Sequence, residues 1–278
     1  MLLVCTLAGY YYATVLTKEP FFTAKLFLTL LGVGLTACGA AAINEALEVD
    51  TDSRMSRTRM RPLPAGRMKL PEAVSAAVLT TLAGTAILAR FANPLTGLLA
   101  LSTVVLYAFG YTPLKKITPW STFVGAFPGA APPVLGWTAV RGTLDWEALA
   151  LFAIMFFWQF PHFLAIAWLY RDDYDRAKIK MLPVVDKSGR KTIFQILAYG
   201  TFLIPVSLAP FVLHIGGIWY AVTAVILGVG YLIFGIRLAL LRLPPMAAHS
   251  KKHARQLLTA SIVYLPMLFL ALALNGGR

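Results

Sequence analysis

Carboxylates are scarce in this chain, and most of them gather in two short segments. Seven of the twelve Asp and Glu residues are Glu45, Glu48, Asp50 and Asp52 in the first segment and Asp172, Asp173 and Asp175 in the second. In the first segment Asn44, Glu48 and Asp52 recur every four residues. On a helix this spacing places them on one face, about 6 Å apart along the axis. Like charges at this spacing repel, so we expect a cation between them.

Metal binding is the chemistry that such a row suits. Carboxylate and amide oxygens are preferred ligands of Mg²⁺, with Mn²⁺ as an alternative, and Mg²⁺ is often shared with substrate phosphates. The second segment offers similar ligands, so two metal ions could bridge one diphosphate. The candidate metal ligands are Asn44, Glu48, Asp52, Asp172, Asp173 and Asp175. A solvated helix end, with its acids paired to nearby arginines, is the alternative interpretation of the first row.

Basic residues follow both acidic rows in the sequence. Two further lysines follow an apolar segment that lies between the rows. Guanidinium groups bind phosphate oxygens, often bidentately, and ammonium groups can offset the charge of a leaving diphosphate. The candidate residues for binding such a group are Arg57, Arg61, Lys115, Lys116 and Arg176, with Tyr174 in the second row. Lys115 and Lys116 are explained equally well as markers of membrane topology.

Membrane helices are the elements that must position these residues. Hydrophobic residues make up 58% of the 278 residues and charged residues only 13%, which excludes a soluble enzyme or a disordered chain. A spanning helix needs about 20 apolar residues. The apolar runs predict an all-α polytopic membrane protein, a single domain over 1–278. We expect nine spans, at 1–16, 24–47, 71–91, 93–112, 119–140, 145–170, 192–213, 217–240 and 256–275.

The net charge of +13 agrees with this topology. Most Lys and Arg residues lie in the connections after the second, fourth, sixth and eighth spans, which the positive-inside rule places in the cytoplasm. Both acidic rows lie at the same face, where the second and sixth spans end. We therefore predict a cytoplasmic N-terminus and a cytoplasmic site mouth. The lipid bilayer, and no nucleic acid, is the partner that the basic loops indicate.

Several segments resemble a known family. The row Asn44-x3-Glu48-x3-Asp52 resembles the Asn-x3-Asp-x3-Asp motif of the UbiA-type intramembrane prenyltransferases, with Glu at its middle position. Five further segments resemble the heme O synthase (protoheme IX farnesyltransferase) branch of that family. They are Met55-Ser-Arg57-Thr58-x-x-Arg61-Pro-Leu, Ala92-Asn-Pro-Leu, Gly129-Ala-Ala-Pro-Pro-Val-x-Gly136, Trp158-Gln-x-Pro-His162 and Asp173-Tyr174 with Met181-Leu-Pro-Val-Val. Together they cover nearly the whole chain.

The resemblance implies nine helices around a central membrane cavity, with metal and diphosphate at its cytoplasmic mouth. It implies Mg²⁺, farnesyl diphosphate as donor, heme b as a substrate rather than a cofactor, and heme O as product. A bacterial plasma membrane is the implied location, and heme A synthase or oxidase assembly proteins are the implied partners. The catalytic residues would be Asn44, Glu48, Asp52 and Asp173.

Two other functions remain open at this point. The first is a UbiA-type enzyme that prenylates a quinone precursor or a chlorophyll-like ring. The second is a transporter whose acids bind a coupling cation, although transporter sites tend to lie near the bilayer midplane at a repeat interface. The acids of this chain follow the ends of apolar spans, which favours an enzyme.

His162 is an ionisable residue inside an apolar span, and such a residue suggests a function. It could bind the heme iron, orient a propionate, or cap carbonyl groups that Pro161 frees. Aromatic faces near it could stabilise a cation. The candidates are Phe156, Phe157, Trp158, Phe160 and Trp168, although packing is the more common role of such residues.

Overall fold

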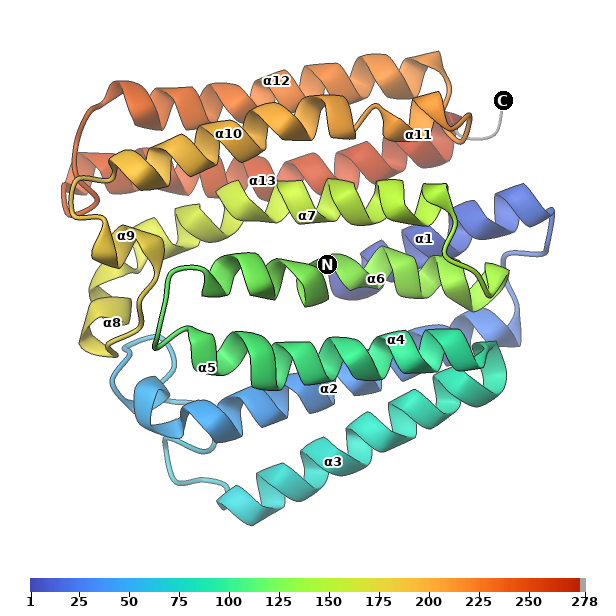
Figure 1. Cartoon of the computed structure of the whole chain (residues 1–278), viewed down its shortest axis with the longest axis horizontal. Coiled ribbons are helices and arrows are strands. Elements are labelled where there is room, and N and C mark those ends of the chain that lie inside the picture. Colours follow the sequence, from blue (N-terminus) through green and yellow to red (C-terminus); the bar gives the residue numbers. More distant parts are fainter. Residues whose placement is uncertain (276–278) are drawn as a thin grey trace.

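Long apolar helices lie side by side along the whole molecule (Figure 1). The computed structural model describes residues 1–275, and within that range it contains helices and no strands. Eight helical segments are long and apolar enough to cross a membrane. They are α2 (Ala24–Ser53), α3 with η1 (Leu70–Ala92), α4 with η2 and α5 (Pro94–Leu114), α6 (Ser121–Arg141), α7 (Trp146–Leu169), α10 with α11 (Arg190–Val212), α12 (Ile218–Leu240) and α13 (Ala248–Asn275).

Shorter pieces complete the chain. Helix α1 (Leu2–Thr17) is apolar and has 16 residues, somewhat short for a span. Three of the spans are divided. The first consists of α3 (Leu70–Ile87) and the π-helical turn η1 (Leu88–Ala92), and the second of α4 (Pro94–Val105), the π-helical turn η2 (Leu106–Tyr111) and α5 (Thr112–Leu114). The third consists of α10 (Arg190–Val206) and α11 (Ala209–Val212). Two short helices, α8 (Arg171–Arg176) and α9 (Leu182–Val185), follow α7.

The all-α polytopic prediction is confirmed, and the nine predicted spans correspond to α1 and the eight longer segments. Two of the predicted boundaries are wrong. Helix α2 continues past 47 to Ser53, and α13 begins at Ala248 instead of 256. Hydropathy detects only the apolar part of a helix, whereas polar turns at its end can continue beyond the membrane. As a result, the row Asn44, Glu48 and Asp52 lies entirely on a helix. Residues 276–278 of the predicted single domain lie outside the described residues.

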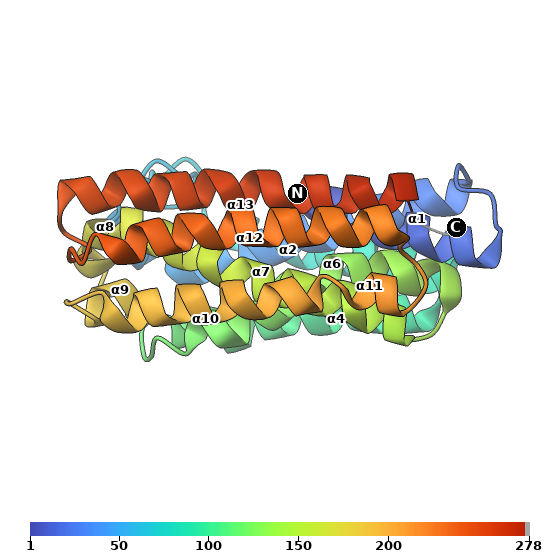
Figure 2. The same ribbon diagram turned by 90° about the horizontal axis from the view of Figure 1, so that it is seen from above.

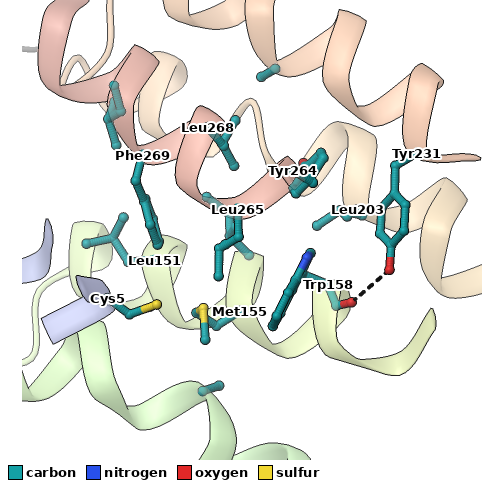
Figure 3. Packing of buried hydrophobic residues seen from close by; sticks show 14 of the residues in the cluster. Cys5, Leu151, Met155, Trp158, Leu203, Tyr231, Tyr264, Leu265, Leu268 and Phe269 are labelled. Carbon is teal, nitrogen blue, oxygen red and sulfur yellow. Dashed lines mark hydrogen bonds between the residues drawn. The ribbon is translucent and has the colours of Figure 1, made fainter. Parts of the chain in front are cut away.

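The main core lies between α7 and the three helices α10, α12 and α13 (Figure 3). Trp158 of α7 donates through Nε1 to the backbone oxygen of Ser261 at 2.9 Å, and Tyr231 donates to the backbone oxygen of Trp158 at 3.4 Å. In lipid, hydrophobic burial gives little drive for helix association, so close packing and such interhelical hydrogen bonds hold helices together. These contacts fix the position of α7 in this half of the bundle.

Small residues let α1 and α6 approach each other closely. A Cβ atom at Gly136 would lie 1.9 Å from the backbone oxygen of Thr6, and one at Gly9 would lie 1.9 Å from that of Pro133. Only glycine fits at these two positions, as is common where membrane helices cross. Because α6 also packs on α7, this contact joins α1 to the rest of the bundle.

The short helices α5, α8 and α9 gather at one end of the bundle, together with the connection 54–69 that follows α2 (Figures 1 and 2). We call this the α8 end. The chain segments there are tied by hydrogen bonds. Ser56 donates to Asp173, and the backbone N–H of Lys180 donates to the backbone oxygen of Lys115 at 2.7 Å. The α8 end thus brings together segments that are far apart in the sequence.

Asp186, which follows α9, supplies the fold with a pH-dependent contact. Its carboxylate accepts hydrogen bonds from Ser188 Oγ at 2.8 Å and from Thr192 N at 2.9 Å. Burial raises the pKa of Asp186, but the hydrogen bonds outweigh this effect and hold the pKa below its usual value. The contribution to stability is therefore full above about pH 4 and is lost as the pH falls through the lowered pKa.

We expect the variant Asp186→Asn to unfold more easily than the wild type by about 1 kcal/mol at pH 7, because the charge-assisted hydrogen bonds are weakened. The difference should shrink as the pH falls toward 3. Thermal unfolding in detergent from pH 3 to pH 7 measures it. The exposed Asp50→Asn is the control and should change little, since its partner Arg54 is also exposed. A difference that is constant with pH would contradict this account of Asp186.

Candidate active site

A polar pocket lies where α2 reaches the α8 end of the bundle. The predicted row Asn44, Glu48 and Asp52 lines it, and these side chains belong to residues that are only 3–6% exposed. The other polar residues that line it are Arg57, Thr58, Arg61, Tyr107, Tyr111, Lys115 and Tyr174. Acidic and basic groups from three segments of the chain therefore face one another in a largely buried space.

Glu48 is at the centre of this pocket. Its Oε2 atom accepts hydrogen bonds from Lys115 Nζ at 2.7 Å and from Asn44 Nδ2 at 2.9 Å. Asn44 Nδ2 also donates to Thr112 Oγ1 at 3.0 Å. Lys115 is 8% exposed, and its Nζ lies 4.7 Å from the centre of the Tyr111 ring. Burial lowers the pKa of Lys115, while the Glu48 carboxylate opposes this shift by favouring the charged form.

Asp52 is held by the connection that follows α2. Arg61 Nη1 donates to Asp52 Oδ2 at 2.8 Å, and Arg61 Nε lies 3.5 Å from Glu45 Oε1. Thr58 Oγ1 donates to the backbone oxygen of Asp52 at 3.0 Å. The connection therefore folds back over the end of α2 and brings its cations to the acidic row.

One oxygen of the row has no partner. Glu48 Oε1 is buried and accepts no hydrogen bond from the residues that the structure describes. Such an atom is costly to bury, and a bound cation would satisfy it. Together with Asn44 and Asp52 it offers the amide and carboxylate oxygens that Mg²⁺ prefers. Within 1–275, His, Cys, Asp and Glu side chains form no group of three close enough to hold a metal by themselves. Water or phosphate oxygens would have to complete the coordination.

An apolar cavity of about 410 Å³ adjoins the polar pocket. It lies between α2, α4, α6 and α7, and its size is typical of ligand pockets. Five residues line both spaces, namely Arg57, Tyr107, Tyr111, Tyr174 and Met181. The two spaces therefore form one site with a charged end and an apolar end. Such a site suits a molecule with a charged head and a hydrocarbon tail.

Known proteins share this sequence and this fold. The model of the UbiA prenyltransferase family matches residues 2–262. The chain belongs to this family. It is 49% identical to a protoheme IX farnesyltransferase of Koribacter versatilis over 96% of this chain and 86% of that protein. It is 46% identical to a protoheme IX farnesyltransferase of Solibacter usitatus over 88% and 82% of the two chains.

Two solved structures show the same UbiA fold at low sequence identity. A digeranylgeranylglyceryl phosphate synthase has a TM-score of 0.78 at 18% identity, over 98% of this chain and 93% of that chain. A UbiA homologue from Archaeoglobus fulgidus, bound to DMAPP and Mg²⁺, has a TM-score of 0.65 at 15% identity, over 95% and 96% of the two chains. The chain is therefore an integral membrane protein with the UbiA prenyltransferase fold.

The second acidic row of this UbiA chain lies beside the polar pocket and does not line it. Asp173 is 7% exposed, accepts hydrogen bonds from Ser56 Oγ at 2.7 and 2.8 Å, and is paired with Arg176. Arg57 separates the two rows, because it lines the polar pocket, the apolar cavity and a surface cleft that holds Asp173. Its Nη2 atom lies 3.4 Å from the Tyr174 hydroxyl.

Three other candidates lie farther away. Asp172 is exposed and accepts a hydrogen bond from Lys251 Nζ at 2.9 Å, which lowers the pKa of Asp172. Asp175 and Lys116 are also exposed. Neither of them lines the polar pocket or the apolar cavity. Of the two adjacent lysines, the structure brings only Lys115 to the acidic row.

His162 lies on the side of α7 that faces α13. Its Nδ1 atom is 2.7 Å from Ser261 Oγ, and its ring stacks on that of Trp158 at 4.8 Å. Among the described residues, the His162 ring forms no hydrogen bond with a carbonyl group that Pro161 frees. The Ser261 hydroxyl donates to the backbone oxygen of Leu258 at 2.5 Å. Ser261 Oγ then accepts from His162 Nδ1–H, which leaves Nε2 as the basic nitrogen.

The aromatic candidates do not line the cavity. Phe160 stacks on Tyr199 of α10 at 3.7 Å, and Trp168 donates to Ser250 Oγ at 3.0 Å. Phe156, Phe157 and Trp158 also pack against neighbouring helices. The aromatic residues that do line the cavity are Tyr107, Tyr111, Phe163 and Tyr174. Tyr107 and Tyr111 belong to the π-helical turn η2, a distortion that is frequent at functional sites.

The pairing of Lys115 with Glu48 gives a test of the charge arrangement. In buffer free of divalent metal, Lys115→Met should cost about 3–5 kcal/mol of unfolding free energy, because it leaves a buried carboxylate without its cation. The double variant Lys115→Met/Glu48→Gln should recover much of that loss. Denaturant unfolding in detergent measures both.

The neighbouring Lys116→Met is the matched control for this pair. Lys116 is exposed, so its replacement should change the free energy of unfolding by no more than about 0.5 kcal/mol. Equal free energies of unfolding for Lys115→Met and Lys116→Met would show that Lys115 is not needed to compensate the buried charge of Glu48.

Proposed function

We propose that this protein transfers the farnesyl group of farnesyl diphosphate to a vinyl group of heme b, which yields heme O and diphosphate. The observation that carries the proposal is a buried charged pocket that adjoins an apolar cavity and shares five lining residues with it. A prenyl diphosphate has the same two parts. The relatives that share 46–49% of the sequence and are named protoheme IX farnesyltransferases support heme as the acceptor.

Mg²⁺ is the metal that we propose, held by Asn44, Glu48 and Asp52, and Mn²⁺ could replace it. The unpartnered Glu48 Oε1 atom supports this assignment, as does the Mg²⁺ bound to the Archaeoglobus fulgidus homologue. A second ion would use Asp173, with Asp172 and Asp175 nearby, once Ser56 and Arg176 release the Asp173 carboxylate. When bound, the metal withdraws electrons from the diphosphate and makes it a better leaving group.

The residues of the pocket would stabilise charge in the transition state. Arg57, Arg61 and Lys115 offset the negative charge that grows on the diphosphate as the bond between farnesyl C1 and oxygen breaks. Arg176 and the more distant Lys116 add positive charge at the rim. Tyr174 positions Arg57 through the contact at 3.4 Å. The apolar cavity excludes water from the allylic cation, which limits its premature hydrolysis.

The positive charge on farnesyl C1 determines which bonds the heme vinyl group forms. The terminal carbon of the heme vinyl group forms a bond with farnesyl C1, which leaves a cation on the inner vinyl carbon. Water adds to that carbon and loses a proton, and a hydroxyethylfarnesyl group results. The tyrosine rings of Tyr107 and Tyr111, at the junction of pocket and cavity, present π-faces that stabilise the cations.

We also propose that His162 binds heme b through Nε2. The hydrogen bond between Nδ1 and Ser261 fixes the tautomer and the ring orientation, as such bonds do for metal-binding histidines. The site would open to the cytoplasmic side of a bacterial plasma membrane, with the N-terminus on the same side, and residues 1–278 would act as one domain. Heme A synthase or oxidase assembly proteins are the partners that would receive the product.

Incubation of the purified protein with farnesyl diphosphate, heme b and Mg²⁺ tests the proposed activity. Mass analysis of the heme should detect heme O. With 4-hydroxybenzoate in place of heme b, no prenylated product should form. Removal of Mg²⁺ by a chelator should abolish the reaction.

In the same assay, Asp52→Ala should lose activity by a factor of at least about 10², because it removes a metal ligand and the partner of Arg61. Its elution profile in detergent should stay that of a folded protein. The exposed Asp50→Ala is the matched control and should keep its activity. Normal heme O formation by Asp52→Ala would contradict the proposed metal site.

The heme spectrum tests the role of His162 without any donor. Heme b bound to the wild type should give the Soret band of a histidine-ligated heme. His162→Ala should lose that band, and added imidazole should restore it. The exposed His249→Ala is the control. Identical spectra for wild type and His162→Ala would exclude His162 as a ligand.

A further inference from the structure

On the side far from the acidic row, the apolar cavity meets a packed layer of side chains, which we call its closed end. Val33 of α2, Ala100 of α4 and Leu135 of α6 line that end, and each is at most 4% exposed. These three residues pack together with Leu88, which is fully buried. Gly32 supports Leu88 from the other side, since a Cβ atom there would lie 2.7 Å from Leu88 Cγ. The cavity therefore ends at a packed layer.

The depth of the cavity follows from three helices that run along it. Tyr111 marks the junction with the polar pocket, and a Cβ atom at Gly125 would lie 2.6 Å from its ring, so Gly125 is at the same level. With a rise of about 1.5 Å per residue, Gly125 to Leu135 spans about 15 Å. Tyr111 to Ala100 spans at most about 17 Å, because the wider π-helical turn η2 rises less per residue than an α-helix.

Helix α2 agrees with this depth. Asn44 is joined to Thr112, the residue after Tyr111, by a hydrogen bond of 3.0 Å. From Asn44 to Val33 the helix rises about 17 Å. Three helices therefore place the closed end about 15–17 Å from the residues that would surround the diphosphate.

The extended length of a prenyl chain can be compared with this depth. With carbon–carbon bonds of about 1.5 Å in a zigzag, a farnesyl chain is about 14 Å long, a geranyl chain about 9 Å and a geranylgeranyl chain about 19 Å. Only the farnesyl chain reaches the closed end and still fits between it and the residues that would surround the diphosphate. A shorter chain leaves part of the cavity unfilled, and a longer one meets the packed layer.

We propose that Val33, Ala100 and Leu135 determine the length of the prenyl donor, because they end the cavity at the depth of three isoprene units. This inference rests on the proposed function, since it takes a prenyl diphosphate as the ligand. Ala100 leaves room for the last isoprene unit, and Leu135 blocks a fourth. The selectivity of the donor is thus set at the end of the cavity opposite to the reacting atoms.

Substitutions that deepen or shorten the cavity should shift the selectivity in opposite directions. With geranyl, farnesyl and geranylgeranyl diphosphate in equimolar competition, Leu135→Ala should raise the ratio of geranylgeranyl to farnesyl product about tenfold or more. Ala100→Leu should raise the ratio of geranyl to farnesyl product by a similar factor. Ala100→Val is a milder variant with the same expected direction, should Ala100→Leu fail to fold.

Leu98→Ala is the matched control, because Leu98 is 61% exposed on the outer face of α4. Its product ratios should equal those of the wild type. Unchanged ratios in Leu135→Ala and in the Ala100 variants, or a shift of both in the same direction, would overturn the proposal. General destabilisation cannot produce two opposite shifts.

A second measurement separates this inference from the proposed function. Displacement of radiolabelled farnesyl thiodiphosphate by the three donors, with Mg²⁺ and without heme, reports chain-length preference alone. If the variants shift this preference while no heme product forms, heme is the wrong acceptor and the chain-length assignment stands. If the wild type makes heme O and neither the products nor the binding preference shift, the chain-length assignment fails and the activity stands.

Discussion

The carboxylate of Glu48 must be compensated by positive charge, because it lies buried at the end of a membrane helix. Lys115 provides that charge at 2.7 Å, and it reaches Glu48 only because α5 ends beside α2. Asn44 holds the same carboxylate oxygen and, through Thr112, the start of α5. This one requirement joins α2 to α5 at the α8 end. The second oxygen of Glu48 remains free for a further cation, so the site is both held together and ready for a ligand.

The apolar half of the site depends on how closely its helices can approach. The contacts at Gly9 and Gly136 let α1 pack directly on α6, and the core around Trp158 holds α7 in place. These supports leave the inner faces of α2, α4, α6 and α7 to line a cavity. Its wall and the charged pocket share five residues, so the position of a charged head determines where an apolar tail must lie.

The sequence alone predicted much of this architecture, for identifiable physical reasons. Runs of about 20 apolar residues mark membrane helices, and the spacing of Asn44, Glu48 and Asp52 predicted one shared helix face.

The choice of Lys115 over Lys116 could not be predicted, because it depends on the helix phase after the π-helical turn η2. The separation of Asp173 from the first row was also hidden, since Arg57 reaches between them from a connection without regular periodicity. The cavity tyrosines Tyr107 and Tyr111 were missed, although they flank an unbroken apolar run with the four-residue spacing of one helix face.

A structure of the protein with Mg²⁺ and farnesyl thiodiphosphate, a slowly reacting analogue, tests the central claim most directly. This claim is that the buried charges of Glu48 and its partners bind the diphosphate while the adjoining cavity binds the chain. We predict metal density at Glu48 and Asp52, phosphates in contact with Arg57 and Lys115, and the hydrocarbon chain between α2, α4, α6 and α7. A diphosphate bound in the surface cleft beside Asp173, with Glu48 still paired only with Lys115 and Asn44, would contradict it.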